Sequence, residues 1–487
     1  MTRLVPSATA RRLAASGLSL LLLLPPAGLS QNLPDLGEAA QVDLPPALEQ
    51  RIGQSVLNEY RTQPEFLDDP EVTGFIEGIG QKLAVHSDDV RQPFVFFVLR
   101  DKTLNAFAMP GGYIGVHTGL ILSAESESEL AGVLAHEISH VTQRHLARLF
   151  NKQNQASVPV MVAMALALLA ARNNSQAGMG GVVAATAATV QNQLNYTREF
   201  EREADRLGLN LLERSGYDVR GMGGFFERLQ KFSRLYENNA PGYLRTHPLT
   251  TERIADMGNR IQSRPKHDIP DSLNFRLVQA KILATEGQGR DAVLEFQAQL
   301  REKKYRIEVA AWYGLAYAHL RALNPAAAAQ ALSEVRRFKP ESPLVETLAA
   351  QVQQRQGDAV AAEATLRESL QRFPQNRALS YALIELLQSA QKHEAALRQV
   401  KYDFQYWPND DRLYLLQAKS YAAQGKRLQQ HRSQAEAHAQ RGQLIQAVEQ
   451  LLLAQKSPDG DFFEYSQVDA RLRELKQKQA DEAKDKR

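Results

Sequence analysis

The chain has 487 residues, with 58 Lys and Arg against 55 Asp and Glu, which gives a formal charge of +3 at neutral pH. A balance this close to neutral excludes the strongly basic surface that is typical of nucleic-acid-binding proteins. The sequence contains no Cys, which excludes disulfide bonds and a Cys-linked lipid anchor, and its length exceeds what one hydrophobic core normally spans, so two or more domains are expected.

Residues 1–30 have the layout of a cleaved export signal. Three Arg residues form a positive end, residues 18–24 form an apolar core, and small residues lead up to Gln31. The apolar run ends at Pro25 and is far shorter than the roughly 20 residues that cross a bilayer, which favours a cleaved signal over an anchor. Removing this segment removes three Arg and no acidic residue, so the formal charge of the mature chain is 0.

The next stretch is predicted to hold two helices and a small sheet. Apolar residues recur at helical spacing over 44–60 and 71–85. Residues 94–99 are rich in β-formers and apolar on both faces, which predicts a buried strand. Residues 105–109 and 113–116 then predict a pair of strands joined by a Pro-Gly-Gly turn.

A helix with metal-binding spacing follows. His136 and His140 are four residues apart, so on a helix both imidazoles project from one face and can bind a single metal ion. Zinc binds imidazole nitrogens at about 2.0–2.1 Å and keeps one position for water in catalytic sites, where Glu137 would be the base for that water. The alternative is an amphipathic helix whose two His side chains are solvated or bonded to neighbours.

The residues around the two His predict the helix that this site needs. Ser126 and Glu129 have the spacing of a capping box, and helically spaced apolar residues continue from there to Phe150. One helix over 126–150 is therefore expected.

Two patterns could supply a third ligand. A third His ten residues after the first is excluded, because position 146 is Leu, and His145 would point about a quarter-turn away, as a surface residue or a support for a ligand. A carboxylate from a second helix is the other pattern. Glu201 and Asp205 share a helical face, so Glu201 can bind the metal while Asp205 holds the far nitrogen of a ligand His. Glu203 is a competing ligand that points to the other side.

Four motifs occur in order along the chain: residues 104–112, the HExxH helix, Glu201-x-x-Ala-Asp205, and Thr246-His247-Pro248. This order resembles the zinc metallopeptidase family that includes HtpX and the CaaX prenyl proteases. The combination is more specific than any one motif, and the resemblance covers most of the chain. It implies a mainly α (α+β) fold, in which a zincin-like HExxH domain contains a small β-sheet.

The resemblance also implies one Zn²⁺ per chain, bound by His136, His140 and Glu201. Glu137 is then expected to act as the general base, with Asp205 as the support of a ligand His. A purely structural zinc site would need a fourth protein ligand and no base, so the presence of Glu137 favours catalysis.

For three stretches the sequence leaves more than one role open. Residues 105–109 are either the edge strand beside which an extended substrate lies, or a strand that only packs on the zinc helix. Residues 158–171 and 177–190 are apolar but too short to cross a bilayer. In membrane-bound members of the family this region holds spanning helices, so the segment 158–190 is expected to be core, a cover over the site, or a contact with a membrane surface.

His247 has three possible roles. It could donate a hydrogen bond to the oxyanion of the tetrahedral intermediate, bind the zinc in place of water and hold the enzyme inactive, or be an ordinary loop residue.

A repeat occupies the C-terminal half. Pro340, Pro374 and Pro408 are 34 residues apart, and Gly357 and Gly425 mark turns within helix pairs. Small residues recur in the same register at Ala316, Ala350, Ala418, Ala328, Ala362 and Ala396, with Ile384 as the exception. A 34-residue period with small residues where helices cross predicts a tetratricopeptide solenoid, whose usual function is to bind partners.

The expected organisation is therefore a signal peptide at 1–30, a zinc metallopeptidase domain at 31–265 and a tetratricopeptide domain at 266–487. By resemblance, we expect an exported periplasmic endopeptidase that degrades misassembled outer-membrane β-barrel proteins and assists their assembly. The repeats would dock these clients or the β-barrel assembly machinery. The alternative is a non-catalytic chaperone or assembly adaptor with a structural or latent metal site.

Overall fold

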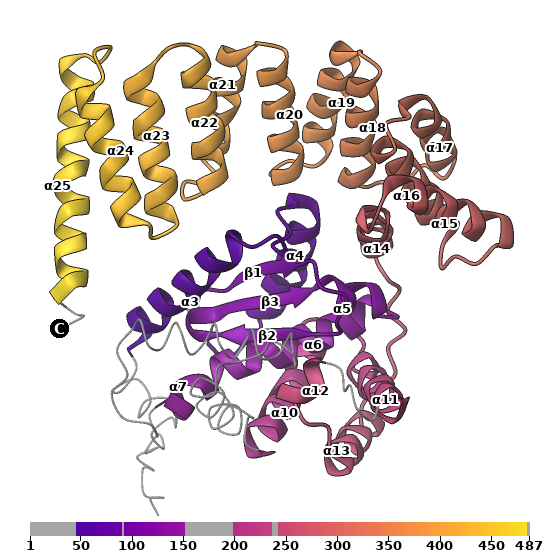
Figure 1. The fold of residues 1–487 in the computed structure, drawn as a ribbon. Helices are drawn as coiled ribbons and strands as arrows, with labels where there is room; N and C mark the ends of the chain where they lie inside the picture. The colour runs from indigo at the N-terminus through magenta and orange to yellow at the C-terminus, as the bar shows by residue number, and fades with distance from the viewer. Residues whose placement is uncertain (1–44, 90–91, 151–197, 236–241, 485–487) are drawn as a thin grey trace, which may run out of the picture.

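The computed structural model describes residues 45–89, 92–150, 198–235 and 242–484 (Figure 1). The export segment at 1–30 and the apolar segment at 158–190 lie outside these residues, so their expected roles stay predictions. In the described part, no helix combines the length and the apolar character needed to cross a membrane. A body that contains the sheet is followed by a curved stack of helix pairs that lies along one side of it.

Three strands form a mixed sheet, namely β1 (Val95–Leu99), β2 (Ala106–Met109) and β3 (Tyr113–His117). Their order is β1-β3-β2, with β1 parallel and β2 antiparallel to β3, so the predicted buried strand and strand pair are present. The turn η1 (Pro110–Gly112) needs its glycines. Gly111 and Gly112 both have positive φ, and a Cβ on Gly112 would lie 2.1 Å from the carbonyl oxygen of Pro93.

The helices of this body are α3 (Pro46–Arg61), α4 (Pro70–Ala84), α5 (Thr118–Ser123), α6 (Glu127–Thr142), α7 (His145–Phe150), α10 (Arg198–Arg214), α11 (Arg220–Leu235), α12 (Gly242–Thr246) and α13 (Thr251–Gln262). Alternate strand residues face opposite sides of the sheet. Ile52 and Val56 of α3 pack with Phe97 on one face, whereas α4 and α6 pack with Phe96 and Val98 on the other. The sheet is therefore covered on both faces, and β1 and β2 form its two edges.

Helix α6 begins as predicted but ends early. The Ser126 hydroxyl accepts a hydrogen bond from the Glu129 amide at 3.1 Å, which caps the helix. The helix predicted over 126–150 is instead divided between α6 and α7, because Arg144 has a left-handed φ of 52°. The Arg144 guanidinium forms an ion pair with Glu49 of α3 at 3.0 Å, and the break places His145 beside His140. Periodicity alone does not show such a break, since the apolar spacing continues through it.

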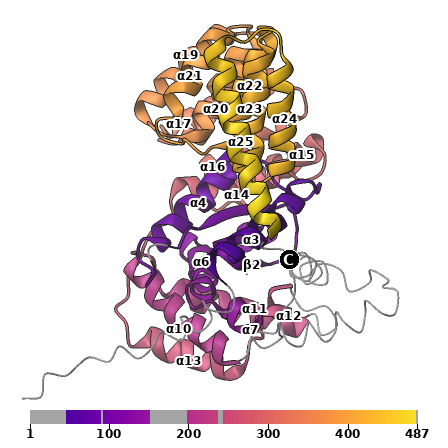
Figure 2. The same ribbon diagram turned by 90° about the vertical axis from the view of Figure 1, so that its left-hand side faces the viewer.

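The second half of the chain consists of α14 (Leu273–Thr285), α15 (Gly289–Glu302), α16 (Glu308–Arg321), α17 (Pro325–Arg337), α18 (Pro343–Arg355), α19 (Ala359–Arg372), α20 (Arg377–Ser389), α21 (His393–Asp403), α22 (Asp411–Ala423), α23 (Arg427–Gln440), α24 (Leu444–Lys456) and α25 (Phe462–Lys484). Helices α18, α20 and α22 begin at Pro343, Arg377 and Asp411, which keeps the predicted 34-residue register. The small residues of that register are buried where the helices cross. The result is the predicted tetratricopeptide solenoid, which ends with the long helix α25 (Figure 2).

The turns inside four successive helix pairs share one backbone conformation. Leu323, Gly357, Gln391 and Gly425 are 34 residues apart, and all four have a positive φ, between 58° and 88°. Glycine adopts this conformation without strain, whereas a side chain with a Cβ costs roughly 1 kcal/mol or more. The repeat geometry therefore requires this left-handed conformation even in the two helix pairs whose turn residue is Leu or Gln.

The body and the solenoid share one hydrophobic core. Phe75 of α4 stacks on Phe275 of α14 with ring centroids 6.2 Å apart. The buried Lys281 ammonium lies 2.6 Å from Asp69 and 2.5 Å from Glu71. Burial alone would lower the pKa of Lys281, but these two carboxylates outweigh it and raise the pKa. The boundary expected near residue 265 thus falls between helices, while the packing continues across it.

The left-handed turns give a test of stability. We expect Leu323→Gly and Gln391→Gly each to stabilise the solenoid by about 0.5–1 kcal/mol, because glycine relieves a strained φ. Gly357→Ala, at the equivalent turn, should destabilise it by a similar amount. Thermal unfolding of the three variants checks the signs, and a fall in the midpoint for both glycine variants would contradict the assignment.

Candidate metal centre

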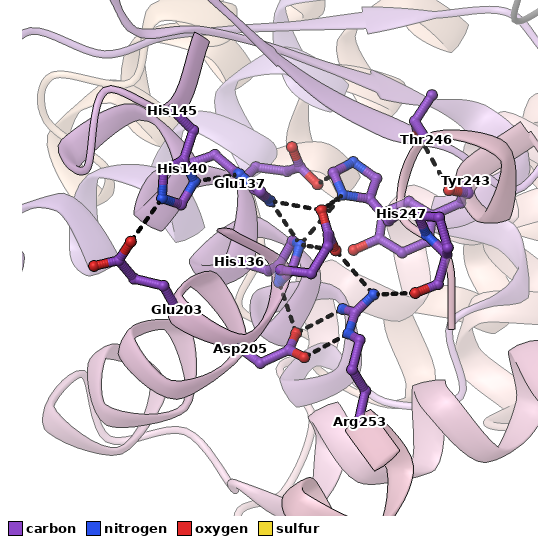
Figure 3. Close-up of polar contacts among 12 residues, drawn as sticks. His136, Glu137, His140, His145, Glu203, Asp205, Tyr243, Thr246, His247 and Arg253 are labelled. Atoms are coloured by element: carbon purple, nitrogen blue, oxygen red, sulfur yellow. Dashed lines mark hydrogen bonds and ion pairs between the residues drawn. The ribbon is translucent and has the colours of Figure 1, made fainter. Parts of the chain in front are cut away.

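Two helices bring the predicted ligands together. Helix α6 carries His136 and His140 (Figure 3), and α10, which packs across it, carries Glu201. All three side chains are buried. The crossing is close because Gly208 of α10 lies against α6. A Cβ there would be 3.1 Å from the backbone of His136. A larger residue would push the carboxylate of Glu201 away from the two imidazoles.

Four buried side chains point their donor atoms at one position: His136, His140, Glu201 and His247, whose atoms all lie within 4.8 Å of one another. The two Nε2 atoms of the α6 His residues are 2.9 Å apart, and His136 Nε2 lies 3.4 Å from His247 Nδ1. Glu201 lies 3.5 Å from both α6 imidazoles and 3.0 Å from His247.

These separations fit a tetrahedral metal ion. Ligands about 2.0–2.1 Å from a tetrahedral zinc are about 3.3 Å from each other. The five donor separations given above lie between 2.9 and 3.5 Å, close to that spacing. Three imidazoles and one carboxylate are also a donor set that zinc accepts. The residues present therefore fit the metal that the motif predicted.

Each α6 imidazole is oriented by a partner behind it. His136 Nδ1 lies 3.0 Å from Asp205, as predicted. Burial disfavours the charged form of His136, but hydrogen bonds to Asp205 and Glu201 outweigh it and raise its pKa to about 9. His140 Nδ1 lies 2.7 Å from His145 Nδ1. Both imidazoles thus keep Nε2 directed at the donor cluster.

Glu203 lies outside the donor cluster. It accepts from His145 Nε2 at 3.1 Å and from Arg148 at 3.2 Å. Burial lowers the pKa of His145 to about 4, so its imidazole is neutral at physiological pH. With Nε2–H donated to Glu203, His145 Nδ1 can accept a hydrogen bond from His140 Nδ1–H. That bond fixes the tautomer in which the lone pair of His140 Nε2 can bind a metal. His145 is therefore a buried support and not a surface residue.

Arg253 is the residue that sequence reasoning missed. Its guanidinium donates to both oxygens of Asp205 at 2.7 Å and forms an ion pair with Glu201 at 2.8 Å. The same group donates to the carbonyl of Pro248 at 2.7 Å, directly after His247. Arg253 thus neutralises two buried carboxylates and fixes the segment that carries the fourth donor. In the sequence, Arg253 stands out only as an Arg in the first turn of a helix. An exposed Arg can occupy the same place, so its role could not be predicted.

His247 and Glu137 lie on the remaining side of the cluster. His247 is buried, so the interpretation as an ordinary exposed loop residue is wrong. Its Nε2 lies 3.5 Å from Glu137 Oε1, and its ring stacks on Tyr243 with centroids 4.6 Å apart. Burial and the nearby Glu137 raise the pKa of Tyr243, so its phenol stays protonated. Tyr243 is a second contact that the sequence did not reveal.

Comparison with known proteins agrees with this geometry. The model of peptidase family M48 matches residues 70–261, which contain every residue of the cluster. The β-barrel assembly-enhancing protease of Escherichia coli K12 is 32% identical over 452 residues, which are 92% of each chain. The chain belongs to peptidase family M48.

Two further relatives match parts of this M48 chain. A putative β-barrel assembly-enhancing protease of Vibrio cholerae is 40% identical over 273 residues, and the match covers 56% of each protein. The mitochondrial metalloendopeptidase OMA1 of Arabidopsis thaliana is 31% identical over 182 residues, which are 37% of this chain and 32% of OMA1. The M48 member described here is a metallopeptidase, and the resemblance found from its motifs is confirmed.

The metal ligands can be tested by substitution. We expect Glu201→Ala to lose most of the bound zinc, and Asp205→Ala to weaken zinc binding about 10–100-fold, because the first change removes a donor and the second a support. Glu203→Ala, on the same helix, removes no donor and acts on His140 only through His145, so it should keep more zinc than either of these variants. Zinc content by mass spectrometry and competition with a chromogenic chelator measure both effects. Loss of metal from the Glu203 variant but not from the Glu201 variant would reverse the assignment.

Proposed function

We propose that the chain is a zinc-dependent endopeptidase of the bacterial envelope that degrades misassembled outer-membrane β-barrel proteins and assists their assembly. The observation that carries the proposal is the buried cluster of four donors with Glu137 at its side. His136, His140 and Glu201 would hold the metal. The repeats at 266–487 would dock the client or the assembly machinery.

The chemistry needs a base next to the metal. Zinc bound at the cluster would lower the pKa of a water molecule and polarise a peptide carbonyl. Glu137 comes from the same turn of α6 as the ligands but is not one of the four donors. Its carboxylate is therefore proposed to take the proton of the attacking water and to pass it to the nitrogen of the leaving amine.

His247 is proposed to hold the enzyme at rest. Its Nδ1 lies among the four donors. With a metal held by His136, His140 and Glu201, it would take the fourth position, where a catalytic site keeps a water molecule. While it stays there, Glu137 has no water to activate. Hydrolysis would require the segment from Tyr243 to Arg253 to move, and the ring stacking and the contacts of Arg253 oppose that movement.

The substrate class and the location rest on similarity. Relatives that cover nine-tenths of this chain carry the name β-barrel assembly-enhancing protease. Residues 1–30, read as a cleaved signal, support export to the periplasm. Client recognition by a tetratricopeptide surface agrees with the usual function of such repeats.

A second candidate function is an assembly adaptor whose metal site stays closed. The presence of His247 among the donors favours it, since four protein ligands are typical of structural zinc. The two candidate functions differ in whether His247 ever moves away from the other three donors.

The role of Glu137 can be isolated. Glu137→Gln should abolish hydrolysis of an unstructured peptide, because the amide cannot accept the proton of water, while zinc content and thermal stability stay near those of the wild type. Peptide cleavage followed by mass spectrometry is the measurement. Full activity in the Glu137→Gln variant with its zinc retained would exclude Glu137 as the base. A chain with full zinc that stays inactive even after His247→Ala would favour the adaptor.

Replacing His247 decides how this residue acts. We expect His247→Ala to raise basal peptide cleavage and self-cleavage with little loss of zinc, because three ligands remain and a water position opens. His267→Ala, at an exposed His beyond α13, serves as the control. If His247 stabilises the oxyanion instead, the same change should lower the rate by about 10²–10³-fold. The two roles predict opposite signs.

A further inference from the structure

Three adjoining cavities lie between the sheet and the solenoid, at the edge of the sheet formed by β1. Their volumes are about 670, 590 and 410 Å³, and Val95 of β1 and Arg377 of α20 line all three. We call the three together the β1 channel. In Figure 1, β1 is the strand nearest to the helix pairs, while the metal centre lies beyond the sheet around α6 and α10. The channel is therefore separate from the metal site.

The outer side of β1 is only partly paired. The Leu67 amide donates to the Val98 carbonyl at 3.0 Å, and the Arg100 amide donates to the Glu65 carbonyl at 2.6 Å, so a short segment pairs antiparallel with the C-terminal half of the strand. Because backbone groups alternate along a strand, those of Phe96 face the same side as those of Val98. No backbone hydrogen bond from another described segment reaches Phe96 on that side. The first half of β1 is an open edge that faces the β1 channel.

Two glycines of α4 keep this edge accessible. Gly74 and Gly78 are four residues apart in the middle of the helix, and both line the β1 channel. A Cβ at either position would meet no atom within 4 Å, so packing does not require glycine there. Glycine destabilises a helix interior relative to alanine. The contrast is Gly80 of the same helix, where a Cβ would lie 2.1 Å from the ring of Phe96.

The solenoid forms the opposite wall of the β1 channel, and ion pairs between side chains that line the channel join it to the body. Arg377 lies 3.3 Å from Glu77 of α4, and Arg412 lies 3.1 Å from Asp68. The wall itself presents Trp407, with Arg377 over its ring at 5.4 Å. A wall with an aromatic ring and charges of both signs can contact many kinds of side chain on a bound peptide, and it does not favour a peptide of one net charge.

We propose that the β1 channel binds an extended segment of an unfolded polypeptide, which pairs with the open edge of β1. Side chains of an added strand point alternately to the two faces of the sheet. One set would enter the cavity beside α4, and the other would enter the cavity beside Gln54 and Tyr113. The inference deepens the proposed function, on which it rests for the identity of the occupant: an extended stretch of an unfolded, β-rich client, held away from the metal centre.

The test uses the full-length chain with Glu137→Gln, so that no bound peptide is cleaved. The probe is a fluorescein-labelled peptide of alternating Val and Thr with Lys at both ends, and fluorescence anisotropy measures its binding. We expect binding that falls about tenfold or more when alternate amides of the peptide are N-methylated, because methylation removes the donors that pair with a strand edge. This comparison needs no further change in the protein. Equal affinity for the two peptides would overturn the proposal.

A matched pair of variants locates the site. Gly78→Trp should fill the β1 channel and weaken binding of the unmethylated peptide about tenfold or more, whereas Gly258→Trp should not. Gly258 is also a helical glycine with no atom near its Cβ position, but it lies in α13, away from the β1 channel. Loss of binding in both variants, or in neither, would contradict the assignment.

Failure of this inference can be told apart from failure of the proposed function. Hydrolysis of a short unstructured peptide is measured in the chain with Glu137 intact, with and without Gly78→Trp. We expect the same rate for both, since neither the metal ligands nor Glu137 line the β1 channel. A chain that hydrolyses no peptide but still binds the strand peptide would contradict the proposed peptidase function and support the proposed binding site.

Discussion

The structure depends on pairing charged side chains that are buried away from solvent. Glu201 and Asp205 are both buried, and each isolated carboxylate would strongly favour the unfolded state. Arg253 offsets this cost by pairing with both carboxylates, and the α6 imidazoles complete their hydrogen bonding. A metal ion would add positive charge at the centre of the same network. The site is therefore assembled from α6, α10 and α13 together, and no single helix can form it.

The same network also holds the segment that carries His247 in place. Pro248 accepts from the same guanidinium that neutralises Asp205, so the backbone directly after His247 is fixed by the residue that fixes the ligands. Tyr243 stacks on the other side of His247. A partner that displaced this segment would have to break the hydrogen bond from Arg253 to Pro248 and the stacking of Tyr243 on His247. Arg253 also holds the metal-site carboxylates. The position of His247 is thus supported by the residues that make the site stable.

The features that could be predicted from the sequence are those set by residues close together in the chain, through their spacing and their chemistry. The His pair, Glu201 and Asp205 follow from helical spacing, and the solenoid follows from its 34-residue register. The break at Arg144 could not be predicted from local spacing, and the ion pair with Glu49 that accompanies it joins residues far apart in the sequence. Arg253 was missed for a similar reason: a buried Arg in the first turn of a helix looks like a solvated one until its partners are placed. The position of His247 depends on α12 and α13 folding back over α6, which no local pattern encodes.

The shared core has a consequence for the order of assembly. One continuous set of buried apolar residues runs from Leu67 in the body to Val352 in α18. The ammonium that satisfies Asp69 and Glu71 comes from Lys281, more than two hundred residues after them in the chain. A polypeptide that emerges N-terminus first therefore has its entire HExxH region available long before the residues that close the core around it. The core of the catalytic half is closed only when the first helix pairs of the solenoid have followed, so the packing that stabilises this half is incomplete in a partly delivered chain.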